Sequence, residues 1–192
     1  MTAPGPEAVR RWFDRRFDFA HLGKDDFPFL LERLRGAPAR AEEKTRALPR
    51  ERLTRKAGEA WSIQEHLGHL ADLDRLHDAR LDDYRAGEAA LRPADLGNRA
   101  TNEARHNERP LAEVSRAFRD ARSRLVARLE AWDPAGVLVS ALHPRLERPM
   151  RLVDMLYFVA EHDDHHLATM TELLATAATG SAPGPVGRGG PP

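Results

Sequence analysis

The chain has 192 residues, a length that favours one domain with at most a short appendage. Its 30 basic residues (Lys and Arg) equal its 30 acidic residues, so the formal net charge is zero. That balance argues against nucleic acid as the main partner, because phosphate binding normally requires a basic excess. No apolar run approaches the roughly 20 residues of a membrane span, and the N-terminus has no apolar signal-peptide core. We therefore expect a cytoplasmic protein that contacts no membrane.

Apolar residues recur at helical spacing through most of the chain, and no segment alternates well enough to predict a strand. Residues 6–17 resemble a short amphipathic arm. The predicted long helices run from just after Asp26 to Ala47 with a bend or break at 36–38, from the Ser62 cap to Ala86, from Pro110 to Trp132, and from Arg151 to Ala177. The second has the clearest signals, because Ser62 to Glu65 matches a capping box and Gly87 suits the position after the helix.

The segments between these helices are polar or rich in turn residues. A polar connection covers 88–109 with room for one short helix, a turn follows at 133–136, and a second connection covers 137–149. Four long helices with one long crossover predict an all-α four-helix bundle. We assign residues 1–24 to an N-terminal arm, 25–178 to the bundle, and the Gly- and Pro-rich residues 179–192 to a disordered tail.

The absence of cysteine limits the chemistry that the protein can perform. Disulfides, thiolate nucleophiles and cysteine-ligated metal sites are excluded. Any metal ion must be held by histidine or carboxylate side chains, and any reacting thiol must come from a substrate.

Three of the nine histidines lie within five residues of the last predicted helix. On a helical projection His166 falls within the apolar face and His162 lies at its edge one turn earlier, whereas His165 points away. A pair at this spacing lets two imidazoles reach one metal ion. Asp163 also falls near the centre of the apolar face, where an unpaired carboxylate is costly, so we assign it a candidate catalytic role.

The second predicted helix carries further inward histidines. His66 and His77 fall inside its apolar face and His69 lies at the edge, so periodicity slightly favours His66 over His69 as the inward residue. A single inward histidine is more often a hydrogen-bonded core residue than a ligand. Histidines on two helices of one bundle favour a metal site, because neutral imidazoles are poor partners for one another without a cation.

Three segments are similar to the DinB superfamily of metal-dependent enzymes, whose members are four-helix bundles with up-down-down-up topology. They are WSIQEHLGHLADLD at 61–74, HPRLERPMRL at 143–152 and FVAEHDDHHLA at 158–168, and the similarity extends over about 25–174. The resemblance implies a metal site formed by His69, His162 and His166, and it favours His69 where periodicity favoured His66.

The resemblance also implies a divalent metal ion, with zinc or nickel as first candidates and iron or manganese as others. It implies a homodimer and a small-molecule substrate, which in some relatives is a low-molecular-weight thiol. The aromatic residues Trp12, Phe13, Phe17 and Phe19 support a dimer if they form an interface, although they could instead cover the bundle.

Several further residues are candidates for the site. Glu65, Asp72 or Asp163 could orient a ligand imidazole or transfer a proton. Trp61 precedes the helix cap and resembles a residue near the site in the family, and Arg145 could hold a carboxylate near the pocket, which makes both candidate binding residues.

We therefore predict a metal-dependent thiol S-transferase or hydrolase. The alternatives are a non-catalytic metal-binding or dimeric stress-related bundle, or a bundle whose histidines merely pack. The polar 88–109 connection, which contains His106, is expected to be a solvated loop unless it contacts substrate.

Overall fold

The computed structural model describes residues 9–179, so the start of the predicted arm and residues 180–192 of the predicted tail lie outside the described residues. Among the described residues the long α-helices are α1 (Phe27–Thr45), α3 (Ile63–Ala86), α5 (Leu111–Glu130) and α6 (Leu152–Thr179). Two short α-helices, α2 (Arg50–Leu53) and α4 (Arg99–Glu103), and two strands, β1 (Ser140–His143) and β2 (Arg148–Arg151), lie between them. None of the described helices is both long enough and apolar enough to cross a membrane.

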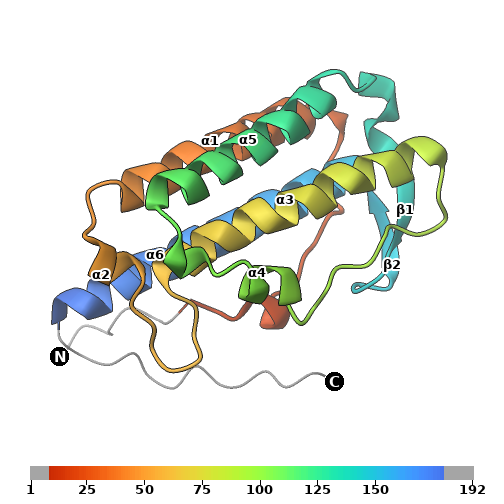
Figure 1. Cartoon of the computed structure of the whole chain (residues 1–192). Coiled ribbons are helices and arrows are strands. Elements are labelled where there is room, and N and C mark those ends of the chain that lie inside the picture. The colour runs from red at the N-terminus through yellow and green to blue at the C-terminus, as the bar shows by residue number, and fades with distance from the viewer. Residues whose placement is uncertain (1–8, 180–192) are drawn as a thin grey trace, which may run out of the picture.

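The four long helices form the predicted four-helix bundle. Helices α1 and α6 run in one direction and α3 and α5 in the other, which is the up-down-down-up order (Figure 1). Because α3 and α5 lie side by side and run in the same direction, the chain between them must return along the length of the bundle. This return passes beside α3 and carries α4, so polar residues of the connection lie against the α3 surface.

The start and end of α3 confirm the sequence prediction. The Glu65 backbone N–H donates to Ser62 Oγ at 3.1 Å, and the Ser62 N–H donates to Glu65 Oε2 at 2.8 Å, which completes the capping box. Gly87 adopts φ of +69°, a left-handed conformation that costs glycine little and ends the helix.

Of the bend or break predicted at 36–38, the break is wrong, because α1 continues through Pro38. A proline inside a helix lacks the N–H that would bond the carbonyl four residues earlier, here that of Leu34. The Arg122 guanidinium supplies the missing donor, since its Nη1 lies 2.9 Å from the Leu34 oxygen. A side chain from α5 thus compensates the main defect that proline introduces into α1.

The expectation of no strands is also wrong. Strands β1 and β2 form an antiparallel hairpin at one end of the bundle, within and just beyond the predicted 137–149 connection. The segment between α3 and α5, here called the 87–110 connection, forms main-chain hydrogen bonds with Leu142 of β1. The Leu142 N–H donates to the Ala89 oxygen, and the Leu91 N–H donates to the Leu142 oxygen, each at 2.9 Å. Strands of four residues are too short for an alternating pattern to distinguish them from a loop.

The bundle core consists of two apolar clusters with a buried charged group between them. Arg122 of α5 binds Asp74 of α3 and Asp163 of α6, with N–O distances from 2.5 to 2.9 Å, and all three side chains are at most 2% exposed. One cluster includes Leu81 and Leu156 toward the hairpin, and the other surrounds Phe118 toward the opposite end.

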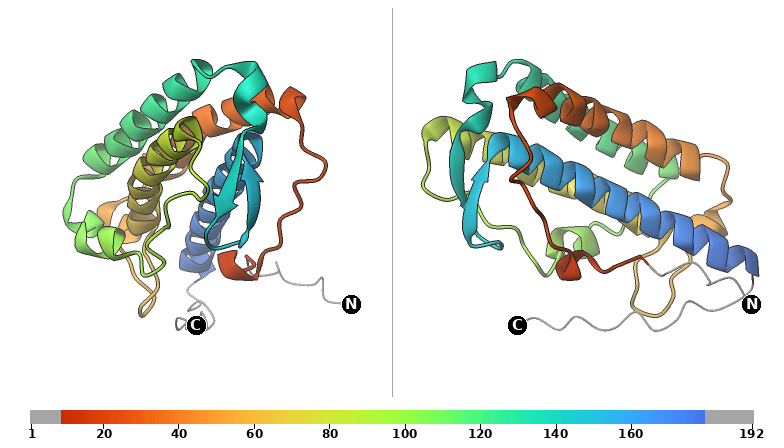
Figure 2. Two further views of the ribbon diagram at one scale, coloured as in Figure 1. Left: turned by 90° about the vertical axis from the view of Figure 1, so that its right-hand side faces the viewer. Right: turned by 180° about the vertical axis from the view of Figure 1, so that it is seen from behind.

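The described part of the N-terminal arm runs along α6 and mostly covers the protein's own core (Figure 2). Phe17 and Phe19 are buried and Trp12 is partly buried, whereas Phe13 is 61% exposed. Arg148 and Arg151 hold the arm by donating to the carbonyls of Phe17 and Phe19. Three of the four aromatic residues thus pack within the chain, and the homodimer stays a prediction.

Candidate metal centre

Helices α3 and α6 bring three buried histidines together. His69 comes from α3, and His162 and His166 lie one turn apart on α6. One ring nitrogen from each can be chosen so that all three lie within 4.8 Å of one another. Such a cluster is compatible, after small side-chain adjustments, with one ion at about 2.0–2.1 Å from each nitrogen.

The hydrogen bonds indicate which nitrogen of each histidine would bind an ion. Thr101 donates its single hydroxyl proton to Asp72 Oδ2 at 3.1 Å, so its oxygen accepts from the His69 Nδ1–H, also at 3.1 Å. This arrangement leaves a lone pair on His69 Nε2. The Nε2 atoms of His162 and His166 already face each other at 3.0 Å.

All three imidazoles are neutral at pH 7, as metal ligands must be. Burial lowers the pKa of His69 to about 4, and it lowers the pKa of His162 and His166 well below their ordinary value of 6.5. Neighbouring imidazoles add to the effect on the last two residues. Buried neutral nitrogens that face one another at close range suit a cation, and the residues present therefore fit a divalent metal ion.

Thr101 and His106 of the 87–110 connection, together with Asp72 of α3, form a second group of residues around His69. Asp72 Oδ2 contacts His106 Nε2 at 2.8 Å as well as the Thr101 hydroxyl, so one carboxylate joins two residues that the sequence analysis placed in a polar connection. Thr101 was not among the candidate residues. In the sequence Thr101 is only one hydroxyl in a polar stretch. Its contact with His69 joins positions 32 residues apart, and no local pattern indicates such a contact.

His66, which periodicity favoured, lies next to the cluster rather than among its three nitrogens. Its Nδ1 is 2.8 Å from Nδ1 of His166, so it can accept the proton of that nitrogen and orient the ring. His165 is half-buried against Trp12, with the ring centroids 5.7 Å apart. His69 therefore joins the α6 pair, while His66 acts on one member of it.

The two carboxylates proposed as catalytic have other partners. Both oxygens of Asp163 are bound by Arg122 in the core. The Glu65 carboxylate caps α3 and contacts Lys56 Nζ at 3.2 Å. Asp72 is the carboxylate that the structure connects to His69, because it receives the Thr101 hydroxyl bond.

A cavity of ≈ 300 Å³ opens beside the three histidines, and Trp61 and Arg145, the two candidate binding residues, both line it. The Trp61 ring lies 4.5 Å from the His69 ring between centroids, and its Nε1 donates to Asn102 Oδ1 at 3.2 Å. The Arg145 guanidinium lies over the ring of Trp12 at 5.6 Å. The candidate metal centre is thus accessible to a small molecule.

The fold and the site together define a four-helix bundle with a candidate histidine metal centre between two of its helices. Residues 33–170 match the DinB superfamily, and the chain belongs to this superfamily. No curated protein matches the chain.

Two solved structures show the same fold at low sequence identity. YfiT from Bacillus subtilis, described as a probable metal-dependent hydrolase with an unusual four-helix bundle topology, is 20% identical with a TM-score of 0.73, and the match covers 86% of this chain and 94% of YfiT. A mycothiol-dependent maleylpyruvate isomerase is 12% identical with a TM-score of 0.63, and the match covers 81% of this chain and 63% of the isomerase.

Proposed function

We propose that this protein is a metal-dependent enzyme that acts on a small molecule and holds one divalent ion through His69, His162 and His166. The observation that carries the proposal is the cluster of three buried histidine nitrogens within 4.8 Å of one another beside a cavity. A structural metal site is usually closed by four protein ligands, whereas three ligands beside a cavity are typical of catalysis.

The ion would lower the pKa of water or of a substrate thiol and so supply a nucleophile at neutral pH. The chain's own residues orient the ligands: Thr101 holds His69 through its Nδ1, and His66 holds His166 in the same way. Trp61 packs against His69, with the ring centroids 4.5 Å apart, and forms part of the cavity wall beside it. Zinc and nickel are the first candidates, followed by iron and manganese.

The reaction we propose is hydrolysis or transfer of a thiol. A hydrolase agrees with the description of YfiT, and a thiol-dependent reaction agrees with the mycothiol dependence of the isomerase. Because the chain has no cysteine, the thiol in a transfer reaction must be a substrate, such as a low-molecular-weight thiol. We assign Asp72 as the carboxylate that could accept a proton, because the Thr101 hydroxyl links it to His69.

Metal stoichiometry tests the proposal directly. The purified protein, depleted of metal and reloaded with zinc or nickel, is expected to bind one ion per chain. His166→Ala should lose most of its affinity, and the matched control His165→Ala, one residue away on the same helix, should keep it. Circular dichroism should show that both variants remain helical. Full metal occupancy in a folded His166→Ala variant would contradict the metal centre.

Activity assays then separate the alternatives. Ester hydrolysis by the loaded protein supports a hydrolase, and conjugation of a small thiol to an electrophile supports a transferase. Stoichiometric metal binding with neither activity supports the non-catalytic metal-binding bundle instead.

A further inference from the structure

Two arginines line the cavity without a carboxylate partner. Among the described residues no acidic oxygen lies within ion-pair distance of Arg80 or Arg145, although Arg80 is only 2% exposed. Arg122 shows the usual arrangement in this protein, since it is equally buried but binds two aspartates. A buried guanidinium without a bonded anion is costly, because its charge is removed from water and only weakly compensated. Asp83 attracts Arg80 from a distance, but its carboxylate oxygens bond Arg92.

The contacts of Arg80 leave part of its donor capacity unused. Its Nε and Nη2 donate to the Arg92 carbonyl at 3.1 and 3.0 Å, and its Nη1 lies 3.3 Å from His143 Nε2. The other nitrogen of that ring, Nδ1, accepts the Leu146 backbone N–H at 3.2 Å. Burial lowers the pKa of His143 to about 3, so the ring is neutral and carries one proton.

The single proton of His143 must therefore lie on Nε2, because a backbone N–H can only donate. Arg80 Nη1 and His143 Nε2 are then two N–H donors that face each other without an acceptor between them. A third unpartnered nitrogen, the buried Nδ1 of His77, belongs to the same cavity wall; within the described structure it has no hydrogen bond. An oxygen acceptor in the cavity would satisfy the first two donors.

Arg145 approaches the same cavity from the turn between β1 and β2. Its guanidinium lies over the rings of Phe13 and Phe158, with the carbon 5.1 and 5.3 Å from the ring centroids. These contacts fix its position by cation–π attraction, and no hydrogen-bond acceptor for its N–H groups lies among the described residues. Burial lowers the pKa of Arg145, and it lowers the pKa of Arg80 to about 10. A guanidinium stays protonated in proteins, so both residues are charged at neutral pH.

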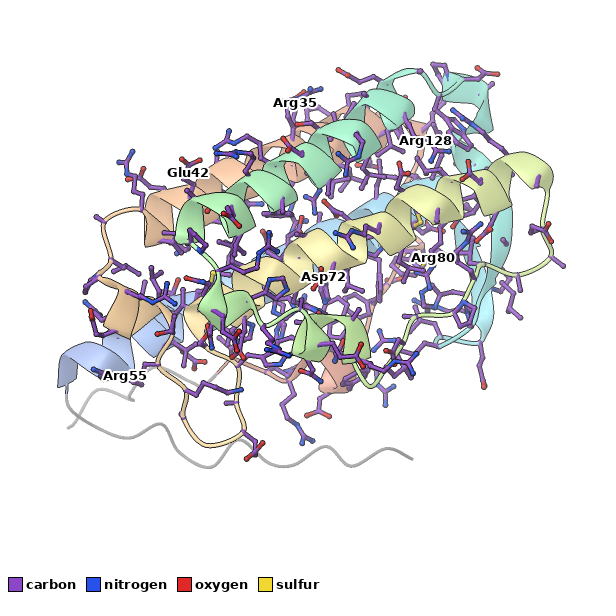
Figure 3. All side chains as sticks on the ribbon, in the orientation of Figure 1. Arg35, Glu42, Arg55, Asp72, Arg80 and Arg128 are labelled. Atoms are coloured by element: carbon purple, nitrogen blue, oxygen red, sulfur yellow. The ribbon has the colours of Figure 1, made fainter. Side chains whose placement is uncertain are left out.

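Arg80 lies away from the metal ligands along α3, whereas Arg145 lies over the ring of Trp12, which contacts the His162 ring with the centroids 4.8 Å apart. His69 and Arg80 line the same cavity and are separated by 11 residues, which corresponds to about 16 Å of helix axis. Long side chains on a helix lean toward its N-terminus, so Arg80 reaches back toward His69. Asp72 and Arg80 both lie on the side of α3 that faces the 87–110 connection (Figure 3). The cavity therefore has a histidine end and a polar end at Arg80 and His143, with Arg145 near both.

We propose that Arg80, Arg145 and His143 bind a carboxylate of the substrate, while the reacting group lies at the three-histidine end. The proposal rests on the proposed function only for the position of the reacting group, because the carboxylate site itself requires no metal. Aromatic and aliphatic residues between the two ends, such as Leu73, Leu76 and Phe158, suit an apolar body. The substrate class is thus a carboxylic acid with an apolar body that lies between its carboxylate and the three-histidine end of the cavity.

Benzoate and its neutral counterpart benzamide test the carboxylate site in the full chain, both metal-depleted and zinc-loaded. Trp12 and Trp61 line the cavity, so binding can be followed by tryptophan fluorescence and checked by calorimetry. We expect benzoate to bind at least 10-fold more tightly than benzamide. Arg145→Gln should weaken benzoate binding about 10- to 100-fold, the range for a lost charge-assisted hydrogen bond, and should leave benzamide binding unchanged.

Arg128→Gln is the matched control, since it removes the same charge from an arginine that pairs with Asp78 and Asp82 outside the cavity. It should bind benzoate like the unmodified protein. Arg80→Lys keeps a charge but cannot reproduce the two bonds to Arg92, and it should also weaken benzoate binding. If Arg80→Lys does not fold, Arg145→Gln still decides the question.

Absence of benzoate binding, equal affinity for benzoate and benzamide, or an unaltered affinity in Arg145→Gln would overturn the carboxylate site. Failure of the metal proposal gives a different result. In that case the His166→Ala variant would keep its metal, and benzoate binding would still depend on Arg145. His166→Ala is otherwise expected to bind benzoate in the metal-depleted state.

Discussion

The imidazole of His69 is bonded through Nδ1 to the hydroxyl of Thr101, which belongs to the short helix α4, at 3.1 Å. The polar connection between α3 and α5 therefore reaches the candidate metal centre and selects the tautomer of one ligand. Asp72 completes the arrangement, because it accepts the Thr101 proton and lies 2.8 Å from His106 Nε2. A segment that resembles a solvated loop in the sequence is part of the site.

Thr101→Val removes this hydroxyl with little change in volume. We expect the affinity for zinc to fall about 10- to 100-fold, as for other losses of a residue that orients a metal ligand. Competition with a chelator of known affinity measures the change. Thr45→Val is the control, because the buried Thr45 hydroxyl bonds only the backbone of α1. An equal loss in both variants would contradict a specific role for Thr101.

Gly68→Ala tests the packing of His106 against α3. A Cβ at residue 68 would lie 2.2 Å from a ring carbon of His106, so the ring must shift, and the shift should disturb its contact with Asp72. We expect a loss of roughly 1–3 kcal/mol in the free energy of unfolding and weaker metal binding.

Gly36→Ala provides the comparison for that variant. Nothing lies within 4 Å of a Cβ there, and Gly36 is also inside a helix. The substitution should therefore stabilise the protein by about 0.5–1 kcal/mol, the ordinary helical preference for alanine. Urea unfolding of both variants measures the two effects, and a stabilised Gly68→Ala would disprove the clash.

Asp163→Asn leaves Arg122 with one carboxylate in a buried site. Breaking a buried ion pair costs on the order of 3 kcal/mol, so we expect a loss of that size in urea unfolding of the metal-depleted protein. Asp164→Asn, one residue on, removes partly exposed contacts with Arg33 and Arg40 and should cost at most about 1 kcal/mol. Similar losses in the two variants would show that the buried pair contributes no more than the surface pairs.

Protonation of His143 is expected to lower the free energy of unfolding of the protein in acid. Its pKa is about 3 in the folded state, chiefly because of burial, and 6.5 is the ordinary value expected on unfolding. Between these values the unfolded state binds more protons, so the stability is fully present above pH 6.5 and declines as the pH falls toward 3. The slope for one such group is at most about 1.4 kcal/mol per pH unit.

Comparison with His143→Gln isolates this effect. The difference in the free energy of unfolding between the two proteins should narrow as the pH is lowered from 7 to 5. A difference that stays constant over this range would mean that His143 is not kept neutral by the fold.

The bundle and the α6 histidine pair could be predicted from the sequence because they depend on local patterns. The 162 and 166 positions follow from helix geometry, and Ser62 and Glu65 cap α3 through contacts within one turn. Periodicity could not separate His66 from His69, since both are buried and differ only in their partners.

Features that depend on distant residues were missed. The helix continues past Pro38 because Arg122, 84 residues later, bonds the Leu34 carbonyl. Thr101 and Arg80 join the site region through contacts with residues tens of positions away, and neither carries a motif. Asp163 was correctly identified as an inward carboxylate that needs a partner, but its partner is Arg122.

The Arg122 ion-pair group also determines how the helices can slide against one another. A shift of α5 by one turn, about 5.4 Å, would move the guanidinium away from both aspartates and into one of the apolar clusters. Every such misalignment carries an uncompensated charge, which strongly disfavours it. Asp163 is adjacent to His162, and Asp74 lies just over one turn beyond His69. The same salt bridges that hold α3 and α6 in register therefore align their histidines across the interface, and this alignment exists before any ion arrives.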